Sequence, residues 1–360
     1  MVRSTKVNLQ RLEQVILKLG FGLTYILDFE SEFMSSLPKI WDAFPDLEAP
    51  LQRVVAQLHD TWQLDFPEIQ QTVEAQLFAG KLVRPALTLL FSQLKDAEIS
   101  EQAVKLASVV ELLHYATLVH DDVIDDSDAR RGVASVQSAV GKDTAVYTGD
   151  YLFVLLFELL NEVGDQTINA TAINSLRTIL VGELHQKANR FDTAMTMERY
   201  FEQIQGKTAA LFQLATYFGA KTADVTANVV QLAEQIGYHL GVAFQLMDDY
   251  LDFVSEEDVL GKPANQDVFN GIYTAPMIMA LQSQNAHSQA ISAQLQNPAF
   301  DQAAYQTVKT HIEASGALDE LKTMIEVHSQ KTRTLITELP AGIVQDQLLQ
   351  VTDMLLARSY

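Results

Sequence analysis

Apolar residues recur at spacings of three and four through most of the 360-residue chain, whereas runs that alternate Val, Ile or Thr with polar residues are scarce. The first pattern is typical of amphipathic helices and the second of strands. Glycine and proline are few, 16 and 9, and many of them fall between the periodic segments, as at Gly80, Pro85, Gly132 and Gly206. These residues commonly mark the ends of helices. The pattern predicts an all-α protein built as a single large helical bundle.

The amino-terminal stretch is less regular than the rest. Residues 1–48 form an amphipathic segment that ends near Phe44, Pro45 and Pro50. We expect an N-terminal helical extension there. Residues 49–360 contain no low-complexity linker and no clear internal repeat, so we expect them to fold as one continuous domain.

Composition narrows the possible functions. Acidic residues outnumber basic ones by 46 to 25, a net charge of -21, and such a surface repels nucleic acid. The absence of cysteine excludes disulfides, thiolate nucleophiles and cysteine zinc sites. The most apolar run, residues 151–160, is interrupted by Glu158 and is shorter than the roughly 20 residues of a membrane span. The polar residues after Met1 make a poor secretory signal. We expect a cytoplasmic protein with no nucleic-acid partner and no membrane span.

Two aspartate clusters with the pattern Asp-Asp-x-x-Asp carry the candidate chemistry. The first runs from Asp121 to Asp125 and the second from Asp248 to Asp252. Residues four apart share one face of a helix, so each cluster directs two carboxylates the same way. Oxygen ligands of this kind suit magnesium, which is commonly shared between carboxylates and substrate phosphates.

A solvated helix end is the alternative interpretation of either cluster, because charged runs usually lie on the surface. Both clusters, however, close strongly apolar segments, residues 109–119 and 240–247. Carboxylates at the rim of an apolar core need a counter-charge, because an unpaired buried charge is strongly destabilising. The sequence context therefore favours metal sites.

Further motifs surround the aspartate clusters. In chain order they are Gly80-Lys81-Leu82-Val83-Arg84-Pro85, Arg130-Arg131-Gly132, Gly149-Asp150-Tyr151-Leu152, Gly182-Glu183-Leu184-His185-Gln186, Gly206-Lys207-Thr208-Ala209-Ala210-Leu211-Phe212 and Gly261-Lys262-Pro263. Together they resemble the trans-isoprenyl diphosphate synthase (polyprenyl synthetase) family, in particular its long-chain members and the catalytic component of heptaprenyl diphosphate synthases. Ordered motifs are far more specific than one cluster. The resemblance is dense over residues 70–280 and implies the isoprenoid synthase fold with a central substrate cavity.

The resemblance also implies a role for each matching residue. The residues for isopentenyl diphosphate are Lys81, Arg84, His114 and Arg131. Those for the allylic diphosphate are Arg130, Lys207, Thr208, Gln245 and Lys262. Magnesium, about three ions in all, would be held by Asp121, Asp125 and Asp248, with Asp122, Asp249 and Asp252 as outer or water-mediated contributors. The residues expected to carry catalysis are Asp121, Asp125, Asp248, Lys207 and Arg130.

The implied reaction begins with ionisation of the allylic diphosphate, which the metal ions and cationic side chains stabilise. The alkene of isopentenyl diphosphate then attacks the allylic cation, and loss of a proton gives a product one isoprene unit longer. No side-chain nucleophile is required. The apolar helix walls are expected to keep water from the cation.

Residues upstream of the first aspartate cluster predict the product length. One helical turn rises about 5.4 Å, close to one extended isoprene unit, so Thr117 and Ala116 are placed to limit the next unit. Both are small, which favours a long-chain product. Leu113 and Leu112 lie one turn further and are also placed to close the channel. A short-chain farnesyl or geranylgeranyl diphosphate synthase is the alternative.

The chain departs from the family pattern at three positions. Ala79 and Asn265 stand where the family usually has glycine, and Ile272 stands where it often has lysine. We expect modest effects on affinity and no change of reaction type.

Two other function classes share some of these features. A class I terpene cyclase ionises its substrate in the same way but does not need the second diphosphate site of Lys81, Arg84 and Arg131. A non-catalytic helical subunit of a two-component synthase would lack the aspartate clusters that are intact here. We expect a homodimer, and a small regulatory subunit is a further possible partner.

Overall fold

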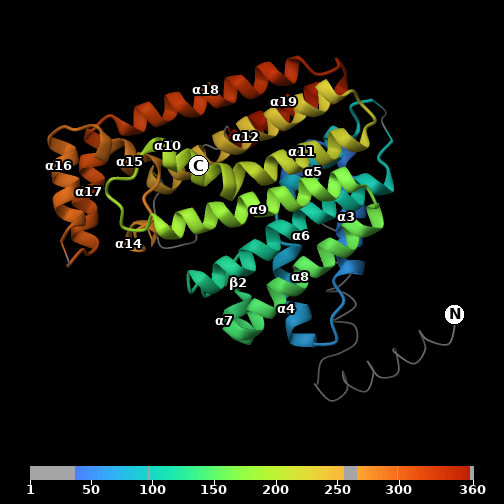
Figure 1. Ribbon diagram of the computed structural model, residues 1–360, viewed down its shortest axis with the longest axis horizontal. Coiled ribbons are helices and arrows are strands. Elements are labelled where there is room, and N and C mark those ends of the chain that lie inside the picture. The colour runs from blue at the N-terminus through green and yellow to red at the C-terminus, as the bar shows by residue number, and fades with distance from the viewer. Residues whose placement is uncertain (1–36, 96–97, 255–265, 298, 357–360) are drawn as a thin grey trace.

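The computed structural model describes residues 37–95, 98–254, 266–297 and 299–356, and its regular structure is almost entirely helical (Figure 1). The helical segments of the first part are η1 (Lys39–Trp41), α3 (Pro45–Thr61), α4 (Pro67–Leu77), α5 (Val83–Ser92), α6 (Glu101–Ile124), α7 (Val136–Val140), α8 (Lys142–Val163) and α9 (Gln166–Ala188). Those of the second part are α10 (Met197–Ile204), η2 (Gln205–Ala209), α11 (Ala210–Thr222), α12 (Ala227–Val254), α14 (Gln266–Phe269), α15 (Ala275–Gln282), α16 (Ala286–Leu295), α17 (Gln302–Ala314), α18 (Ala317–Thr337) and α19 (Ile343–Leu356). The prediction of an all-α fold is confirmed.

Helix α6 lies inside the larger apolar cluster and packs against α3, α5, α8 and α11. Most of its side chains before the aspartates are fully buried. The Ser100 hydroxyl accepts a hydrogen bond from the Ala103 backbone N–H at 3.1 Å and so caps its first turn. Asp125 directly follows its last residue, Ile124. The apolar length of α6 therefore delivers the first aspartate cluster to the edge of the core.

The second aspartate cluster lies on α12. This helix packs against α11 on one side and against α18 along much of its length (Figure 1). Helix α11 contacts both α6 and α12, so one buried helix separates the two aspartate-bearing helices. A second apolar cluster, which includes residues of α12, α15, α17 and α18, supports the carboxyl-terminal half.

Helix α9 and the π-helical segment η2 meet backbone to backbone. A Cβ atom added to Gly206 would lie 2.7 Å from the Thr178 carbonyl oxygen and 2.8 Å from the Gly182 Cα atom. Only glycine at these two positions permits so close an approach. π-helical turns are frequent at functional sites, and this one carries Lys207 and Thr208.

A two-residue antiparallel ribbon follows α6. Its strands are β1 (Ala129–Arg130) and β2 (Val133–Ala134), paired Ala129 to Ala134 and Arg130 to Val133. The turn residues Arg131 and Gly132 both have positive φ, 53° and 82°. This is the geometry of a type I′ turn, in which a non-glycine residue is strained.

The predicted extension over residues 1–48 falls largely outside the described residues, which begin at 37. Trp41, Phe44 and Leu47 are buried in the main core, and α3 runs without a break through residue 48. Within the described parts of the chain, no helix is both long and apolar enough to cross a bilayer.

Candidate active site

The carboxylate of Asp121 lies in a group of charged side chains from three elements. Burial raises the pKa of Asp121 to about 7; the Lys207 ammonium opposes this shift, and the carboxylates of Glu183 and Asp125 add to it. Carboxylates that raise one another's pKa gain stability from a bound cation. The donors of the first cluster therefore fit a divalent metal ion.

Lys207 is held between two side chains of α9. Its Nζ donates to Glu183 Oε2 at 3.3 Å and to Gln186 Oε1 at 2.9 Å. Burial lowers the pKa of Lys207, but Glu183 and Asp121 together outweigh burial and raise it. The ammonium is thus charged and points toward the first aspartate cluster. Sequence reasoning gave Glu183 and Gln186 no role, although both lie in a motif beside Gly182.

The other aspartates of the first cluster have arginine partners. Arg130 Nε donates to both oxygens of the buried Asp122, at 3.0 and 3.3 Å, and Arg130 Nη2 also contacts Asp122 Oδ1. Through this bidentate pair, the Asp122 carboxylate contacts Arg130 on strand β1 of the ribbon. Arg190 Nη2 donates to Asp125 Oδ1 at 2.9 Å. Arg190 was not predicted, because it follows α9 and reaches α6 only through the tertiary fold.

Asp249 of the second cluster is buried and fully engaged. Its carboxylate accepts hydrogen bonds from Tyr200 Oη at 2.6 Å, Gln245 Nε2 at 2.9 Å and the Ala275 backbone N–H at 3.1 Å. Burial raises the pKa of Asp249 to about 7, and these hydrogen bonds act in the opposite direction. Asp249 therefore ties α12 to α10 and α15. Tyr200 was not predicted.

The predicted allylic residues Thr208 and Gln245 lie together. Thr208 Oγ1 donates to Gln245 Oε1 at 2.5 Å, which links η2 to α12 and continues the chain of hydrogen bonds to Asp249. Asp252 adds its charge to the surroundings of Asp249. Lys262 and Asn265 lie outside the described residues, and Ile272 is buried.

A cationic group surrounds His114, two turns before Asp121 on α6. Burial and the charges of Arg84, Arg131 and Arg130 lower the pKa of His114 well below its usual value. Burial lowers the pKa of Arg84 to about 10, against the raising effect of Glu111 and Asp248. Arg84 Nε is buried and has no hydrogen-bond partner among the described residues. A buried unpaired donor with the charge of Arg131 nearby fits an anionic ligand.

The remaining predicted residues border this group. Lys81 is exposed, and its carbonyl oxygen accepts a hydrogen bond from Trp41 Nε1 at 2.7 Å. Leu112, Leu113 and Ala116 are fully buried, whereas Thr117 is partly buried.

The described residues show the charge pattern of a metal site but no converging set of metal ligands. Across residues 37–356, apart from the gaps, no three His, Asp or Glu side chains converge closely enough to hold an ion together. The Asp125–Arg190 ion pair is one physical reason, because it turns a candidate ligand toward a cationic side chain.

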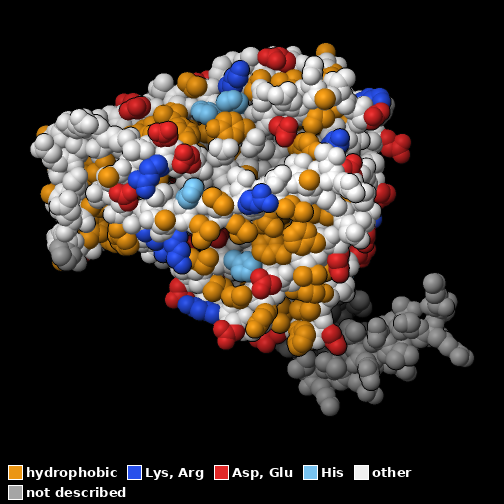
Figure 2. Space-filling view, viewed as in Figure 1, with side chains coloured by type: hydrophobic (Ala, Val, Ile, Leu, Met, Phe, Trp, Pro, Cys, Tyr) orange, Lys and Arg blue, Asp and Glu red, His pale blue; other side chains and the backbone are white. Residues whose placement is uncertain are grey.

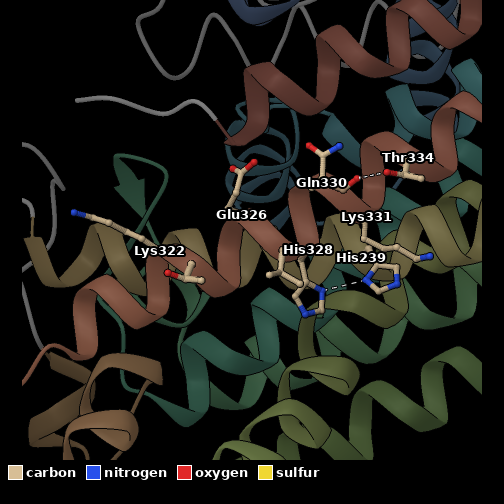
Figure 3. Close-up of a pocket in the computed structure, with 9 residues that line it drawn as sticks. His239, Lys322, Glu326, His328, Gln330, Lys331 and Thr334 are labelled. Atoms are coloured by element: carbon tan, nitrogen blue, oxygen red, sulfur yellow. Dashed lines mark hydrogen bonds between the residues drawn. The ribbon is translucent and has the colours of Figure 1, made fainter.

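An open surface groove of about 910 Å³ lies elsewhere, along α18 and one turn of α12 (Figure 3). His239 and His328 approach each other there, with their Nδ1 atoms 3.1 Å apart. The aspartates and the cationic group around His114 do not line this groove. It is therefore separate from the candidate site.

Comparisons with known proteins identify the family. The polyprenyl synthetase family model matches residues 67–313. A relative from Synechocystis sp. named "Prenyl transferase" is 33% identical over 281 residues, 78% of this chain and 86% of the relative. The "Heptaprenyl diphosphate synthase component 2" of Geobacillus stearothermophilus is 31% identical over 276 residues, 76% of this chain and 85% of the relative.

Solved structures extend the similarity to the fold. The crystal structure of a geranylgeranyl pyrophosphate synthase from Lactobacillus brevis has a TM-score of 0.84 and 33% sequence identity, and the match covers 89% of this chain and 99% of that one. The chain therefore belongs to the polyprenyl synthetase family and is a trans-prenyltransferase.

Proposed function

We propose that the chain is a magnesium-dependent synthase that condenses isopentenyl diphosphate with an allylic diphosphate to give an all-trans polyprenyl diphosphate. One observation carries this proposal. Helix α6 passes two clusters of charged side chains: the cationic group, with arginines around His114, and the carboxylate group, with acidic side chains around Asp121. These two positions are seven residues apart in the sequence, which is about 10 Å along a helix. The cationic group favours an anion and the carboxylate group favours a metal ion. Two diphosphates, one bound directly and the other through metal ions, need these two kinds of site.

The cationic group is the proposed site for isopentenyl diphosphate. Arg84 and Arg131 offer planar sets of donors, His114 adds a ring N–H, and Lys81 adds a charge at the exposed side. The unpaired Arg84 Nε would gain a partner in a diphosphate oxygen. This site needs no metal.

The carboxylate group is the proposed site for the metal ions and the allylic diphosphate. Asp121, Asp125 and Asp248 would hold about three magnesium ions, and magnesium bound there would neutralise the diphosphate as it leaves. Lys207, fixed by Glu183 and Gln186, directs its ammonium to the same place. Thr208 and Gln245 offer a hydroxyl and an amide, and Lys262 is assigned by its motif alone.

The chain's residues have three tasks in the reaction. The cationic side chains stabilise the departing diphosphate while the carbon–oxygen bond breaks. The arginines around His114 hold isopentenyl diphosphate so that its alkene attacks the allylic cation and forms the new carbon–carbon bond. The proton lost from the product goes to the departed diphosphate, and the buried apolar residues of α6 and α11 exclude water.

Long products are the proposed outcome, because Ala116 is small and buried and Thr117 is short. The relative named as a heptaprenyl synthase component favours this assignment. The similarity to a geranylgeranyl pyrophosphate synthase favours the short-chain alternative.

We also propose a homodimer through the outer face of α8 and α9. Large apolar side chains are exposed there: Tyr147 (74%), Val154 (49%), Phe157 (42%), Ile173 (48%), Leu180 (47%) and Leu184 (65%). Figure 2 shows apolar side chains gathered over these two helices. A face of this kind on adjacent helices is typical of an interface. The name "component 2" of the heptaprenyl relative supports a second proposed partner for this chain, a small accessory protein.

The experiment that tests the proposed function is product analysis. The purified chain is incubated with magnesium, radiolabelled isopentenyl diphosphate and farnesyl or geranylgeranyl diphosphate, and the dephosphorylated products are sized by chromatography. Products well beyond the geranylgeranyl length would support a long-chain synthase. A stop at farnesyl or geranylgeranyl length would favour the short-chain alternative. No product from the chain alone would favour an accessory subunit or a non-catalytic role.

A further inference from the structure

Gln76 is a fully buried polar side chain on α4 that links three parts of the molecule. Its Oε1 accepts a hydrogen bond from Tyr115 Oη on α6 at 3.0 Å, and its Nε2 donates to the Ala134 carbonyl oxygen on β2 at 2.6 Å. Tyr115 is also fully buried. Buried polar groups are costly unless they are paired, so the Gln76 amide is stable in this position only while both of its partners stay in place.

The backbone of Gln76 makes a third contact. Arg131 Nη1 donates to the carbonyl oxygens of Gln76 and Leu77, at 2.7 and 3.3 Å, and Arg131 Nη2 lies 3.7 Å from Glu111 Oε1. The guanidinium lies directly over Gly80, where an added Cβ would be 2.4 Å from Nη1. The guanidinium of Arg131 is thus docked on the carboxyl end of α4.

The ribbon that carries Arg131 cannot hold this position unaided. Two-residue strands supply few hydrogen bonds, and an isolated two-stranded hairpin is marginal in water. Arg131 also has a left-handed backbone, with φ of 53°, which costs about 1 kcal/mol or more in a non-glycine residue. The Arg130–Asp122 pair anchors β1, and the Gln76–Ala134 hydrogen bond and the docking of Arg131 on α4 anchor β2 and the turn against this strain.

We infer that Gln76 and Tyr115 are positioning residues for isopentenyl diphosphate, which act by fixing the ribbon and with it the Arg131 guanidinium. This inference rests on the proposed function, because Arg131 belongs to the proposed isopentenyl diphosphate site. Neither residue touches substrate. The Gln76 amide fixes β2 through its hydrogen bond to the Ala134 carbonyl oxygen. The Tyr115 hydroxyl fixes the rotamer of Gln76 in which this hydrogen bond forms.

The Gln76→Leu variant tests this role, because leucine keeps the volume and removes both amide contacts. We expect the KM for isopentenyl diphosphate to rise about tenfold, the effect of losing roughly one hydrogen bond. The KM for the allylic diphosphate should change less than twofold. The Kd of isopentenyl diphosphate, measured by calorimetry without metal, should rise in parallel.

Tyr115→Phe and the double variant test the order of the contacts. Tyr115→Phe leaves the Ala134 hydrogen bond possible, so its KM for isopentenyl diphosphate should rise by about threefold. The double variant should match Gln76→Leu, because both changes act through one amide.

The matched control is Gln70→Leu. Gln70 lies on the same helix and is also engaged on both amide atoms, with Leu64 N–H, the Trp62 carbonyl and Glu74 as partners. None of these partners lies on the ribbon. Gln70→Leu should lower the melting temperature without a selective change in the KM for isopentenyl diphosphate.

The outcomes separate the inference from the proposed function. If Gln76→Leu lowers stability and changes both KM values equally, Gln76 is only structural and the inference is wrong. If wild-type binding of isopentenyl diphosphate is normal and Gln76→Leu leaves it unchanged, the inference alone fails. If the wild-type chain binds no isopentenyl diphosphate, the proposed function fails and the inference fails with it.

Discussion

At the scale of single residues, the site places like charges close together at some cost to stability. Asp121 has two carboxylates nearby, and burial adds to their effect. His114 has three arginines nearby. Groups that are unfavourable in the metal-free and substrate-free protein are those that gain most when a ligand of opposite charge binds.

The Asp121→Asn variant tests this balance. We expect kcat/KM to fall by about a thousandfold or more, because one proposed metal ligand is lost. Stability of the metal-free protein should not fall, because removal of a buried charge relieves its repulsion with Glu183 and Asp125. Product formation and urea unfolding measure the two effects. Asp353→Asn, at a surface ion pair with Arg333, is the control. Activity retained in Asp121→Asn would contradict the metal-ligand assignment.

Product length is also a property of single residues. Ala116 is fully buried one turn before the first aspartate cluster. Ala116→Phe should shorten the main product, because the ring would fill the space of about one isoprene unit. It should also lower stability by about 1–3 kcal/mol, as overpacking does. Ala116→Leu should give an intermediate length. An unchanged product distribution in folded Ala116→Phe would show that the growing chain does not pass this residue.

At the scale of helices, the charged groups are positioned by how the elements meet. The glycine pair Gly182 and Gly206 lets η2 lie directly on α9, and this contact places Lys207 beside Glu183. The chain of hydrogen bonds from Thr208 through Gln245 to Asp249 connects η2 to α12. One rigid segment, η2, is thus fixed to both sides of the proposed allylic site.

Two histidines, His239 on α12 and His328 on α18, meet where these helices pack together. Burial lowers the pKa of His239 to about 4, and the charges of His328 and Lys331 act in the same direction. A histidine with a lowered pKa in the folded state takes up a proton more readily when unfolded. Its contribution to stability is therefore present above a pH of about 6.5 and is lost as the pH falls toward about 4.

Urea unfolding at pH 7.5 and at pH 5 checks this prediction. His239→Gln should remove part of the stability difference between the two pH values, about 1 kcal/mol, since partial exposure screens the full effect. His59→Gln, on the partly exposed surface of α3, controls for loss of a histidine in general. An identical pH dependence in wild type and His239→Gln would show that another group is responsible.

At the scale of the whole molecule, helix periodicity predicted the fold class because it is a local property. The motifs predicted which elements meet at the site, and the structure brings Thr208 to Gln245 and groups Arg84 and Arg131 around His114. Pairs such as Arg190 with Asp125 depend on long-range docking, which periodicity does not contain. Gly206 was expected at the end of a helix, but it lies within the π-helical segment η2, where the absence of a side chain permits the close approach to Gly182.

The proposed dimer is the property of the whole molecule that is simplest to test. Helices α8 and α9 follow each other in the chain, and Leu184 on α9 is 65% exposed within this apolar face. Leu184→Glu introduces a charge into that face. If the face is the interface, burying the charge opposes association, and light scattering after gel filtration should show a monomer.

Val327→Glu is the matched control for this variant. Val327 is 61% exposed, much like Leu184 at 65%, but lies on α18, outside the apolar face of α8 and α9. It should leave the mass unchanged. A wild-type monomer, or a Leu184→Glu variant that is still dimeric, would contradict the interface. Since α9 also holds Glu183 and Gln186 against Lys207, dissociation should lower activity as well, because the same helix serves the interface and the site.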